Sequence, residues 1–380
     1  MYANKISDAE GDNLPGYLIL EGVYDMETTV VKIRQDTEEF TEKEDADLKR
    51  AGKIICNGGL VAFPTETVYG LGGDALNQES SRKIYAAKGR PSDNPLIVHI
   101  SKFEDIYAIA EEVPEAVCRM AEAFWPGPLT MILRKSDKVP RETTGGLNTV
   151  AIRFPSNPTA RKLIEYSGGY IAAPSANLSG KPSPTIAKYV IQDMDGRIDM
   201  IIDGGEVGIG LESTIVDMTL EPPQILRPGY VTKEMLEKVL GEVDTDVTIL
   251  KNDSNQAPRA PGMKYRHYAP KGELVIVEGD REKVIEYINE QVAVKKLCGE
   301  RTGVVATIET CEEYTADVIK CAGSRMDEES IAKHLFRILR EFDDENVDRI
   351  YSESFVSPGL GQAIMNRLLK AAGHKVISLK

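Results

Sequence analysis

The sequence predicts an α/β protein with a large mixed-sheet domain followed by a smaller, Rossmann-like α/β domain. Short apolar runs alternate with helical patterns along most of the chain. This alternation stops between residues 242 and 270, where prolines, a glycine and polar residues are typical of a linker. We therefore expect an N-terminal extension at 1–28, a first domain at 29–241, a linker at 242–270 and a second domain at 271–380.

The first domain is expected to open with a strand at 29–33 and a helix that begins after Thr41. Thr41 and Glu44 have the T-x-x-E spacing of a capping box, and two glycines at 58–59 end the helical pattern. Further strands are predicted near 60–63, 95–100, 129–133, 149–154, 200–203, 213–218 and 223–226, and helices near 79–88, 103–112, 114–125, 157–167 and 232–241.

The second domain repeats the alternation over a shorter stretch. Strands are expected at 273–279, 304–308, 317–323, 348–355 and 375–379, with helices between them, including 327–342 and 361–372. Five apolar residues recur on one face of the 327–342 helix: Ile331, Leu335, Ile338, Leu339 and Phe342.

Composition and charge narrow the function classes. The chain has 380 residues, 42% hydrophobic and 28% charged, as expected for a globular protein with buried cores. Its net charge of −14 argues against a general nucleic-acid binder, which needs a basic face. No apolar run is long enough for a membrane span, and the N-terminus lacks a secretory signal, so we expect a cytoplasmic protein.

The cysteines do not predict a metal centre or a disulfide framework. None of the five forms a CxxC pair or stands beside histidine at metal-ligand spacing. We expect reduced and mostly buried thiols.

Familiar nucleotide-binding motifs are missing from the sequence. There is no GxxxxGK[ST] phosphate loop. The glycine-rich run at 204–210 is followed by a predicted strand rather than a helix, so it does not fit a dinucleotide fingerprint.

Two polar clusters follow predicted strands in the first half of the domain. Residues 64–72, PTETVYGLG, combine hydroxyls with glycines that let a ligand approach the backbone, although an ordinary turn explains them equally well. Lys88 and Arg90 belong to a basic island between Arg82 and Lys102. Such a cluster can bind phosphate, or it can be a solvated surface.

Two more clusters follow later strands. Arg153 ends an otherwise apolar strand, where a buried arginine requires either an anionic ligand or an internal carboxylate partner. The loop at 174–185, PSANLSGKPSPT, presents hydroxyls, an amide and a lysine between prolines. Glu212, Ser213 and Arg227 add further polar groups. Without a nucleophile–histidine pair, this set favours positioning and charge stabilisation, as in nucleotidyl transfer.

Together these motifs resemble the YrdC-type domain of threonylcarbamoyl-AMP synthases. The resemblance rests on FPTETVYGLG, KGRPSDNPLIVHI, TVAIRFP, APSANLSGKPSPT and ESTIVD. PGMKYRHYAP at 261–270 and GLGQAIMNRLLKAAG at 359–373 resemble the long, two-domain form. The resemblance implies a twisted open sheet with a basic concave face. It also implies synthesis of threonylcarbamoyl-AMP and pyrophosphate from L-threonine, bicarbonate or CO₂, and ATP.

The resemblance also implies individual roles. Lys88 and Arg90 would act on the reacting phosphate. Mg²⁺ would arrive with ATP and be held mainly by phosphates, without dedicated protein ligands. Threonine contacts would fall on Thr67, His99, Arg153, Ala173 and Ser213. ATP contacts would fall on Arg90, Asn94, Thr149, Ser175, Asn177, Ser183, Arg227 and Tyr268.

The linker motif at 261–270 is expected to fold over the ATP site as a lid. It contains Lys264, Tyr265, Arg266, His267 and Tyr268, a density of functional side chains that a passive spacer does not need. A linker that is attached to the first domain without contacting substrate is the alternative.

The expected pathway partner is a complex that transfers the threonylcarbamoyl group to adenosine in ANN-decoding tRNAs, with weak or no direct tRNA binding by this chain. Two other functions are weighed against this one. An RNA-binding or ribosome-maturation protein could use the same basic concave sheet, but the net charge of −14 opposes it. A carbamoyl-transferring maturation enzyme is the second, but the accompanying zinc-finger-like cysteines are absent.

Overall fold

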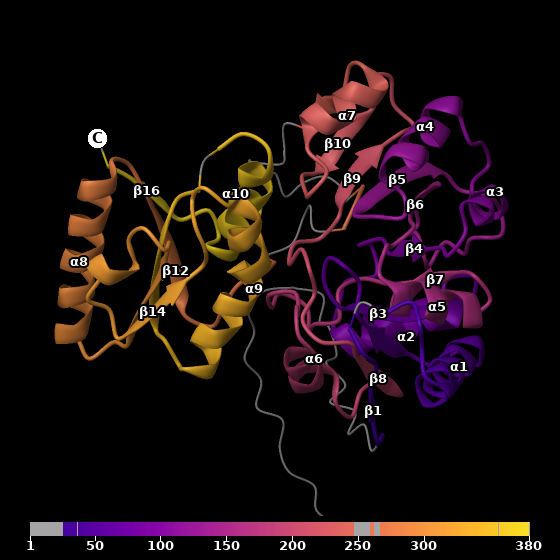
Figure 1. The fold of residues 1–380 in the computed structure, drawn as a ribbon, viewed down its shortest axis with the longest axis horizontal. Helices are drawn as coiled ribbons and strands as arrows, with labels where there is room; N and C mark the ends of the chain where they lie inside the picture. The colour runs from indigo at the N-terminus through magenta and orange to yellow at the C-terminus, as the bar shows by residue number, and fades with distance from the viewer. Residues whose placement is uncertain (1–25, 36, 247–258, 262–266, 356, 380) are drawn as a thin grey trace, which may run out of the picture.

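The computed structural model describes residues 26–35, 37–246, 259–261, 267–355 and 357–379 and contains two sheets. An eleven-stranded mixed sheet has the order β1-β8-β2-β3-β7-β4-β6-β5-β9-β10-β11, and a five-stranded sheet has the order β14-β13-β15-β12-β16. Figure 1 shows them as two units joined through the region of α9 and α10. The α/β fold class is therefore confirmed.

The elements of the first unit cover most of its chain. Its strands are β1 (Thr29–Lys32), β2 (Val61–Phe63), β3 (Gly70–Asp74), β4 (Ile97–His99), β5 (Leu129–Arg134), β6 (Thr149–Arg153), β7 (Ile171–Ala172), β8 (Met200–Asp203), β9 (Thr214–Asp217), β10 (Gln224–Arg227) and β11 (Asp244–Thr245). Its helices are α1 (Glu42–Cys56), α2 (Gln78–Lys88), α3 (Ile106–Ile109), α4 (Glu115–Phe124), α5 (Pro158–Tyr166), α6 (Ala187–Met194) and α7 (Lys233–Leu240).

The register of the first sheet brings chemistry-bearing residues to one edge. β4 and β6 are parallel, and His99 lies opposite Arg153 at their carboxyl ends. β5 runs antiparallel to β6 and parallel to β9, so the start of β9 lies at this same edge. Side chains from segments more than a hundred residues apart therefore converge there.

The second unit is a parallel sheet covered by helices on both faces. It contains β12 (Glu273–Glu278), α8 (Arg281–Leu297), β13 (Thr302–Ala306), β14 (Val318–Cys321), α9 (Glu328–Asp344), β15 (Arg349–Glu353), α10 (Leu360–Ala371) and β16 (Val376–Ser378). Figure 1 shows α8 on the outer side, whereas α9 and α10 face the first unit. All four strand pairs are parallel, as the Rossmann-like pattern predicted.

Local sequence signals were most reliable where capping and periodicity agreed. The capping box at the start of α1 is present, with Thr41 and Glu44 each accepting from the other residue's backbone N–H. The predicted 103–112 helix is instead a 3₁₀ turn, Phe103–Asp105, followed by the four-residue α3. The short strand β3, in which three of the five residues are glycine, and helix α6 were not predicted, because glycines and a proline-rich approach resemble loops.

The expected burial of the cysteines is wrong. Cys56, Cys298 and Cys321 are exposed, Cys118 and Cys311 are half-buried, and all five are free. Three of them, Cys56, Cys298 and Cys321, end a helix or strand or lie just beyond it, where the chain reaches the surface. In the described part of the chain, every helix is too short or too polar to span a lipid bilayer.

Candidate active site

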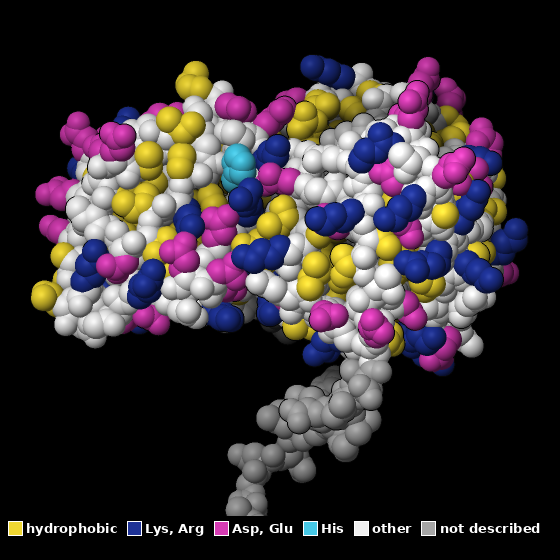
Figure 2. All heavy atoms as spheres, turned by 60° about the horizontal axis from the view of Figure 1, so that its bottom comes forward, with side chains coloured by type: hydrophobic (Ala, Val, Ile, Leu, Met, Phe, Trp, Pro, Cys, Tyr) yellow, Lys and Arg dark blue, Asp and Glu magenta, His cyan; other side chains and the backbone are white. Residues whose placement is uncertain are grey.

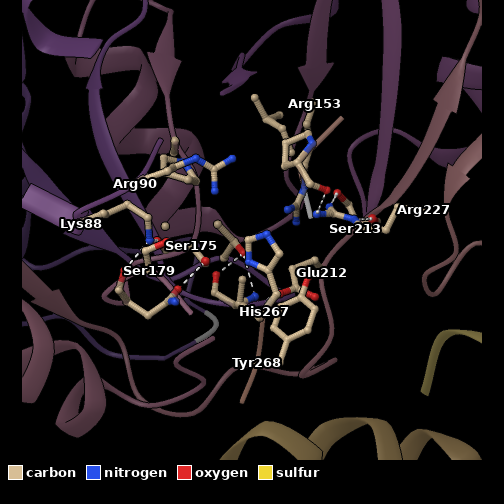
Figure 3. Close-up of a pocket in the computed structure, with 18 of the residues that line it drawn as sticks. Lys88, Arg90, Arg153, Ser175, Ser179, Glu212, Ser213, Arg227, His267 and Tyr268 are labelled. Atoms are coloured by element: carbon tan, nitrogen blue, oxygen red, sulfur yellow. Dashed lines mark hydrogen bonds between the residues drawn. The ribbon is translucent and has the colours of Figure 1, made fainter. Parts of the chain in front are cut away.

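The main pocket lies where β4, β6 and β9 meet the loop after β7. It has about 690 Å³ of non-protein space, including its open mouth. Figure 3 shows two ends, one with Lys88 and Ser175, the other with Arg153 and Ser213, and His267 between them. Its lining includes four cationic residues, Lys88, Arg90, Arg153 and Arg227.

The Arg153 end joins a buried cation to neutral polar groups. His99 is 4% exposed, and burial together with nearby Arg153 lowers the pKa of His99 to about 3. The imidazole is therefore neutral near pH 7. The hydroxyl of Ser213 forms hydrogen bonds with Thr130 Oγ1 at 2.7 Å and with Arg227 Nη2 at 3.1 Å. This end can hold a small zwitterion with a carboxylate and a hydroxyl.

Arg153 also has an internal partner, the alternative considered for a buried arginine on a strand. Its Nη2 lies 2.8 Å from Glu66 Oε1, and the side chains are 5% and 13% exposed. The contact has the distance of an ion pair but not the geometry of a hydrogen bond, since these atoms have no hydrogen-bond partner among the described residues. Two donors of the guanidinium, Nε and Nη2, are therefore buried without a hydrogen-bond partner among the described residues.

Lys88 lies at the other end and is 2% exposed at the carboxyl end of α2. Its Nζ donates to the backbone oxygen of Ser175 at 2.5 Å and also to that of Asn177. Burial holds the pKa of Lys88 well below its ordinary range, and Arg90 adds to the effect. Both acceptors of Lys88 Nζ are neutral carbonyl oxygens. A bound phosphate would add a negative charge that stabilises the ammonium form of Lys88.

The S-x-N pair shapes the loop beside Lys88. Ser175 Oγ donates to Asn177 Oδ1 at 2.5 Å, and Asn177 Nδ2 donates to the backbone oxygens of Leu178 and Lys181 at 2.8 and 2.9 Å. The amide of Asn177 thus helps to fold the loop, and Ser175, Asn177, Ser179 and Gly180 of this loop line the pocket.

Arg90 is half-buried and oriented by the loop that follows it. Its Nε donates to Asn94 O at 3.3 Å and its Nη2 to Pro95 O at 3.1 Å. These bonds aim the guanidinium at the pocket, as Figure 3 shows.

Arg227 lies beside Ser213 at the Arg153 end, whereas Glu212, near Tyr268, forms the floor of the pocket (Figure 3). Arg227 Nε donates to Ser213 O at 3.0 Å, and burial lowers the pKa of Arg227 to about 10. Burial alone would raise the pKa of Glu212, but Arg367 and Arg227 outweigh it and hold that pKa below its ordinary value. The carboxylate of Glu212 is therefore ionised inside a cationic pocket.

The linker residues that the structure describes also reach the pocket. Pro261, His267 and Tyr268 line it, whereas Lys264, Tyr265 and Arg266 lie outside the described residues. Burial lowers the pKa of His267 to about 3 and raises that of Tyr268 to about 12. The contact of the motif with the pocket is what the lid hypothesis requires, and closure itself stays a prediction.

Most residues assigned by resemblance line this pocket, and four do not. Thr67 is fully buried and does not line the pocket, but its hydroxyl lies 2.9 Å from the hydroxyl of Thr65, which does. Asn94 contributes its carbonyl to Arg90, and Ser183 donates to Glu212 at 2.6 Å. Thr149 lines a separate depression with Asn148 and Lys135, because it begins the strand that Arg153 ends.

Only part of the basic island belongs to the site. Arg82 pairs with Glu142 at 2.8 Å on the surface, and Lys83 donates to Gly58 O. Sequence reasoning missed Thr65, Ser179 and the partner role of Glu66. The PTET motif contained Thr65 and Glu66, but nothing local indicates which of its side chains turns inward.

The described residues contain no group of three His, Cys, Asp or Glu side chains that could hold a metal ion. Both carboxylates nearest the pocket are in ion pairs, Glu66 with Arg153 and Glu212 with Arg367. Chemically, the pocket can bind a polyphosphate and an amino acid together and stabilise negative charge between them.

Comparisons with known proteins agree with this chemistry. Residues 53–229 match the family model described as telomere recombination, and residues 231–373 match the threonylcarbamoyl-AMP synthase C-terminal domain. The chain is 48% identical to the threonylcarbamoyl-AMP synthase of Pyrococcus abyssi, over 93% of this chain and 100% of that protein. It is also 48% identical to that of Bacillus subtilis, over 90% and 97%.

A solved structure matches both units. The crystal structure of P. abyssi Sua5 complexed with L-threonine has a TM-score of 0.87 at 47% identity, covering 93% of this chain and 100% of that one.

Proposed function

Because the chain belongs to the threonylcarbamoyl-AMP synthase family, we propose that its pocket has a threonine end and a nucleotide end. The enzyme joins L-threonine, bicarbonate and ATP into threonylcarbamoyl-AMP and releases pyrophosphate, in the pathway of tRNA t6A modification. The observation that carries the proposal is the placement of Arg153 and Lys88 at opposite ends of one pocket.

The threonine end is the one built on Arg153. The substrate carboxylate would take the guanidinium donors that Glu66 leaves unused. Neutral His99 and the hydroxyl of Ser213 would then face the threonine side chain and amine. A neutral imidazole suits this place, because a second buried cation would hold the ammonium form of threonine away.

The nucleotide end is the one built on Lys88 and Arg90. Dehydration of bicarbonate supplies CO₂, and threonine's neutral amine adds to it and releases a proton to water. One oxygen of the resulting carbamate attacks the α-phosphorus of ATP. The bond from that phosphorus to the bridging oxygen breaks, and pyrophosphate leaves with the electron pair. Lys88 and Arg90 would neutralise charge on the transferring phosphate, and the backbone of the Ser175 turn would orient it.

Mg²⁺ is proposed to accompany ATP. Glu66 and Glu212 are each occupied by an arginine, so phosphate oxygens and water would provide most of the metal's ligands. When bound, the ion would neutralise charge on the leaving pyrophosphate.

Transfer to tRNA is proposed to occur elsewhere, in a cytoplasmic complex that consumes the adenylate. Lys88, Arg153 and Arg227 are each at most 5% exposed, so they are placed for a small anion rather than a helix backbone. Figure 2 shows acidic and basic side chains interspersed over one face of both described units, which suits weak or no direct tRNA binding.

The direct test is incubation with ATP, threonine, Mg²⁺ and isotopically labelled bicarbonate, followed by mass analysis. We expect an adenylate that carries the label and the mass of threonine, together with pyrophosphate. Salt-sensitive tRNA binding without ATP, and no adenylate from the folded protein, would contradict the proposal and favour an RNA-binding function.

A further inference from the structure

Two buried arginines of the second unit reach into the first. Arg340 of α9 is 3% exposed, and it donates to Pro182 O through Nε at 2.9 Å and through Nη2 at 2.7 Å. Its Nη2 also lies 2.6 Å from Asp193 Oδ2. Arg367 of α10 is 0% exposed, and its Nε donates to Glu212 Oε2 at 2.8 Å. Both carboxylates therefore come from the first unit and both cations from the second.

The contacts of Arg340 continue to the nucleotide end. Asp193 also pairs with Lys181 Nζ at 2.7 Å and accepts from the backbone N–H of Leu178 at 3.2 Å. The backbone oxygen of Lys181 accepts from Asn177, which in turn accepts from Ser175. An unbroken series of polar contacts thus runs from α9 to the turn that holds Lys88.

The contacts of Arg367 continue to the floor of the pocket. The other oxygen of Glu212 accepts from Ser183 at 2.6 Å. The Arg367 guanidinium carbon lies 5.9 Å from the centre of the Tyr268 ring. The centres of the Tyr268 ring and the Phe336 ring on α9 are 4.9 Å apart. Tyr268 has a backbone φ of 64°, a left-handed conformation that a tyrosine keeps only when its surroundings enforce it.

The helices of the second unit pack directly on the site loops. Val68, Leu211 and Tyr268 belong to the same apolar cluster as Ile331 and Phe336 of α9. A Cβ at Gly210 would lie 2.5 Å from Lys333 Cα, so the first unit's backbone touches the helix closely enough to require glycine. The arginines thus act across a buried, tightly packed contact, where an unmatched charge is costly.

We propose that Arg340 and Arg367 are positioning residues for the synthase reaction. From α9 and α10 they hold the adjacent residues Pro182 and Ser183, one directly and one through Glu212. Through these contacts they set the geometry of the nucleotide end. The second unit therefore completes the ATP site without contributing a group that touches the reacting atoms. This inference rests on the proposed assignment of the nucleotide end.

If Arg340 and Arg367 only joined the two units, their loss would have a different effect from the loss of positioning residues. Another ion pair across the same interface serves as the control. Arg337 of α9 pairs with Glu206 of the first unit at 3.1 Å, but the side chains are 39% and 28% exposed and neither lines the pocket. Loss of Arg337 removes one ion pair between the units without touching the two polar series described above.

The test measures Kd for a non-hydrolysable ATP analogue by calorimetry, with the full chain and its Arg340→Gln, Arg367→Gln and Arg337→Gln variants. We expect the first two to weaken binding roughly tenfold or more, and Arg337→Gln to stay within about twofold, because misplaced positioning groups lose affinity whereas an exposed pair contributes little. Arg340→Lys and Arg367→Lys keep the positive charge but lose the planar guanidinium with its paired N–H donors. Their Kd values should therefore lie between those of the wild type and the glutamine variants. They also keep the test valid if a glutamine variant unfolds.

A purely structural role would lower the melting temperature and the fraction of protein that binds, while the folded fraction keeps its Kd. Wild-type Kd in folded Arg340→Gln and Arg367→Gln would overturn the inference. Product formation by the wild-type enzyme is measured in parallel. If the wild type makes no adenylate, the proposed function fails, while analogue binding still decides the positioning role.

Discussion

The guanidinium of Arg153 lies 2.8 Å from the carboxylate of Glu66, and the two groups meet without hydrogen-bond geometry. The Glu66 carboxylate neutralises the charge of buried Arg153, while the Nε and Nη2 donors of Arg153 make no hydrogen bond among the described residues. We therefore expect the stability of the protein without ligand to be linked to the binding of a carboxylate substrate.

Replacing Glu66 with glutamine should therefore make threonine a stronger stabiliser. The variant leaves a buried guanidinium without its counter-charge, which costs about 3–5 kcal/mol where one partner of a buried pair is lost. Thermal melting should show a lower Tm without ligand and a larger upward shift with threonine than in the wild type. Glu142→Gln, which breaks the surface pair with Arg82, is the control. Equal threonine shifts in Glu66→Gln and wild type would contradict the link.

Arg90→Ala should slow adenylate formation while the protein stays folded. The half-buried guanidinium is aimed at the pocket by Asn94 O and Pro95 O, and losing one donor to a transferring phosphate costs roughly 10²–10³ in rate. Single-turnover mass analysis of the adenylate measures this effect. Arg82→Ala is the matched control, because it belongs to the same basic island but pairs with Glu142 at the surface. Near-normal rates in folded Arg90→Ala would remove it from the catalytic set.

The enzyme should select threonine over valine and serine. The pocket presents the hydroxyls of Ser213 and Thr65 and the neutral imidazole of His99, and a valine methyl in place of the threonine hydroxyl loses hydrogen bonding to such groups, at a cost of about 1–3 kcal/mol. Serine lacks one methyl contact and should be poorer by roughly tenfold. Pyrophosphate release measured with each amino acid gives the comparison. Valine working as well as threonine would show that these hydroxyls do not face the side chain.

Acid should destabilise the protein partly through His99. Burial lowers the pKa of His99 from 6.5 to about 3. Between these values the unfolded chain binds a proton that the folded chain does not, so stability falls as pH decreases through this window. The slope from one such group is at most about 1.4 kcal/mol per pH unit.

His99→Gln should flatten this part of the pH profile. Urea unfolding at several pH values from neutral downward gives the measurement, and His334→Gln in the second unit is the control. An unchanged slope in His99→Gln would mean that the acid sensitivity comes from other groups.

Much of the fold could be predicted because its signals are local. The capping box of α1 and the apolar stripe of α9 are read from neighbouring residues, and both are present. Elements without such signals were missed. The glycines of β3 form a strand only because β2 and β7 pair with it on either side.

The sequence predicted the kind of ligand that the site could bind better than it predicted which side chains line the pocket. The basic cluster of Lys88 and Arg90 and the loop of Ser175 and Asn177 were predicted to bind a phosphate-bearing ligand, and these four residues line one pocket. Thr149 shows the limit of this reasoning. It shares a strand and a motif with Arg153, yet the opposite ends of one strand open on different depressions.

By itself, the sequence determined the α/β class and the family and named the candidate site residues, because these depend on residue type and local spacing. Only the tertiary structure decided which charges meet. Arg340 and Asp193 are 147 positions apart, and Arg367 and Glu212 are 155 apart. No local pattern encodes such pairs. Strand register and the packing of α9 and α10 against the first unit bring these charges together, and burial requires them to be matched.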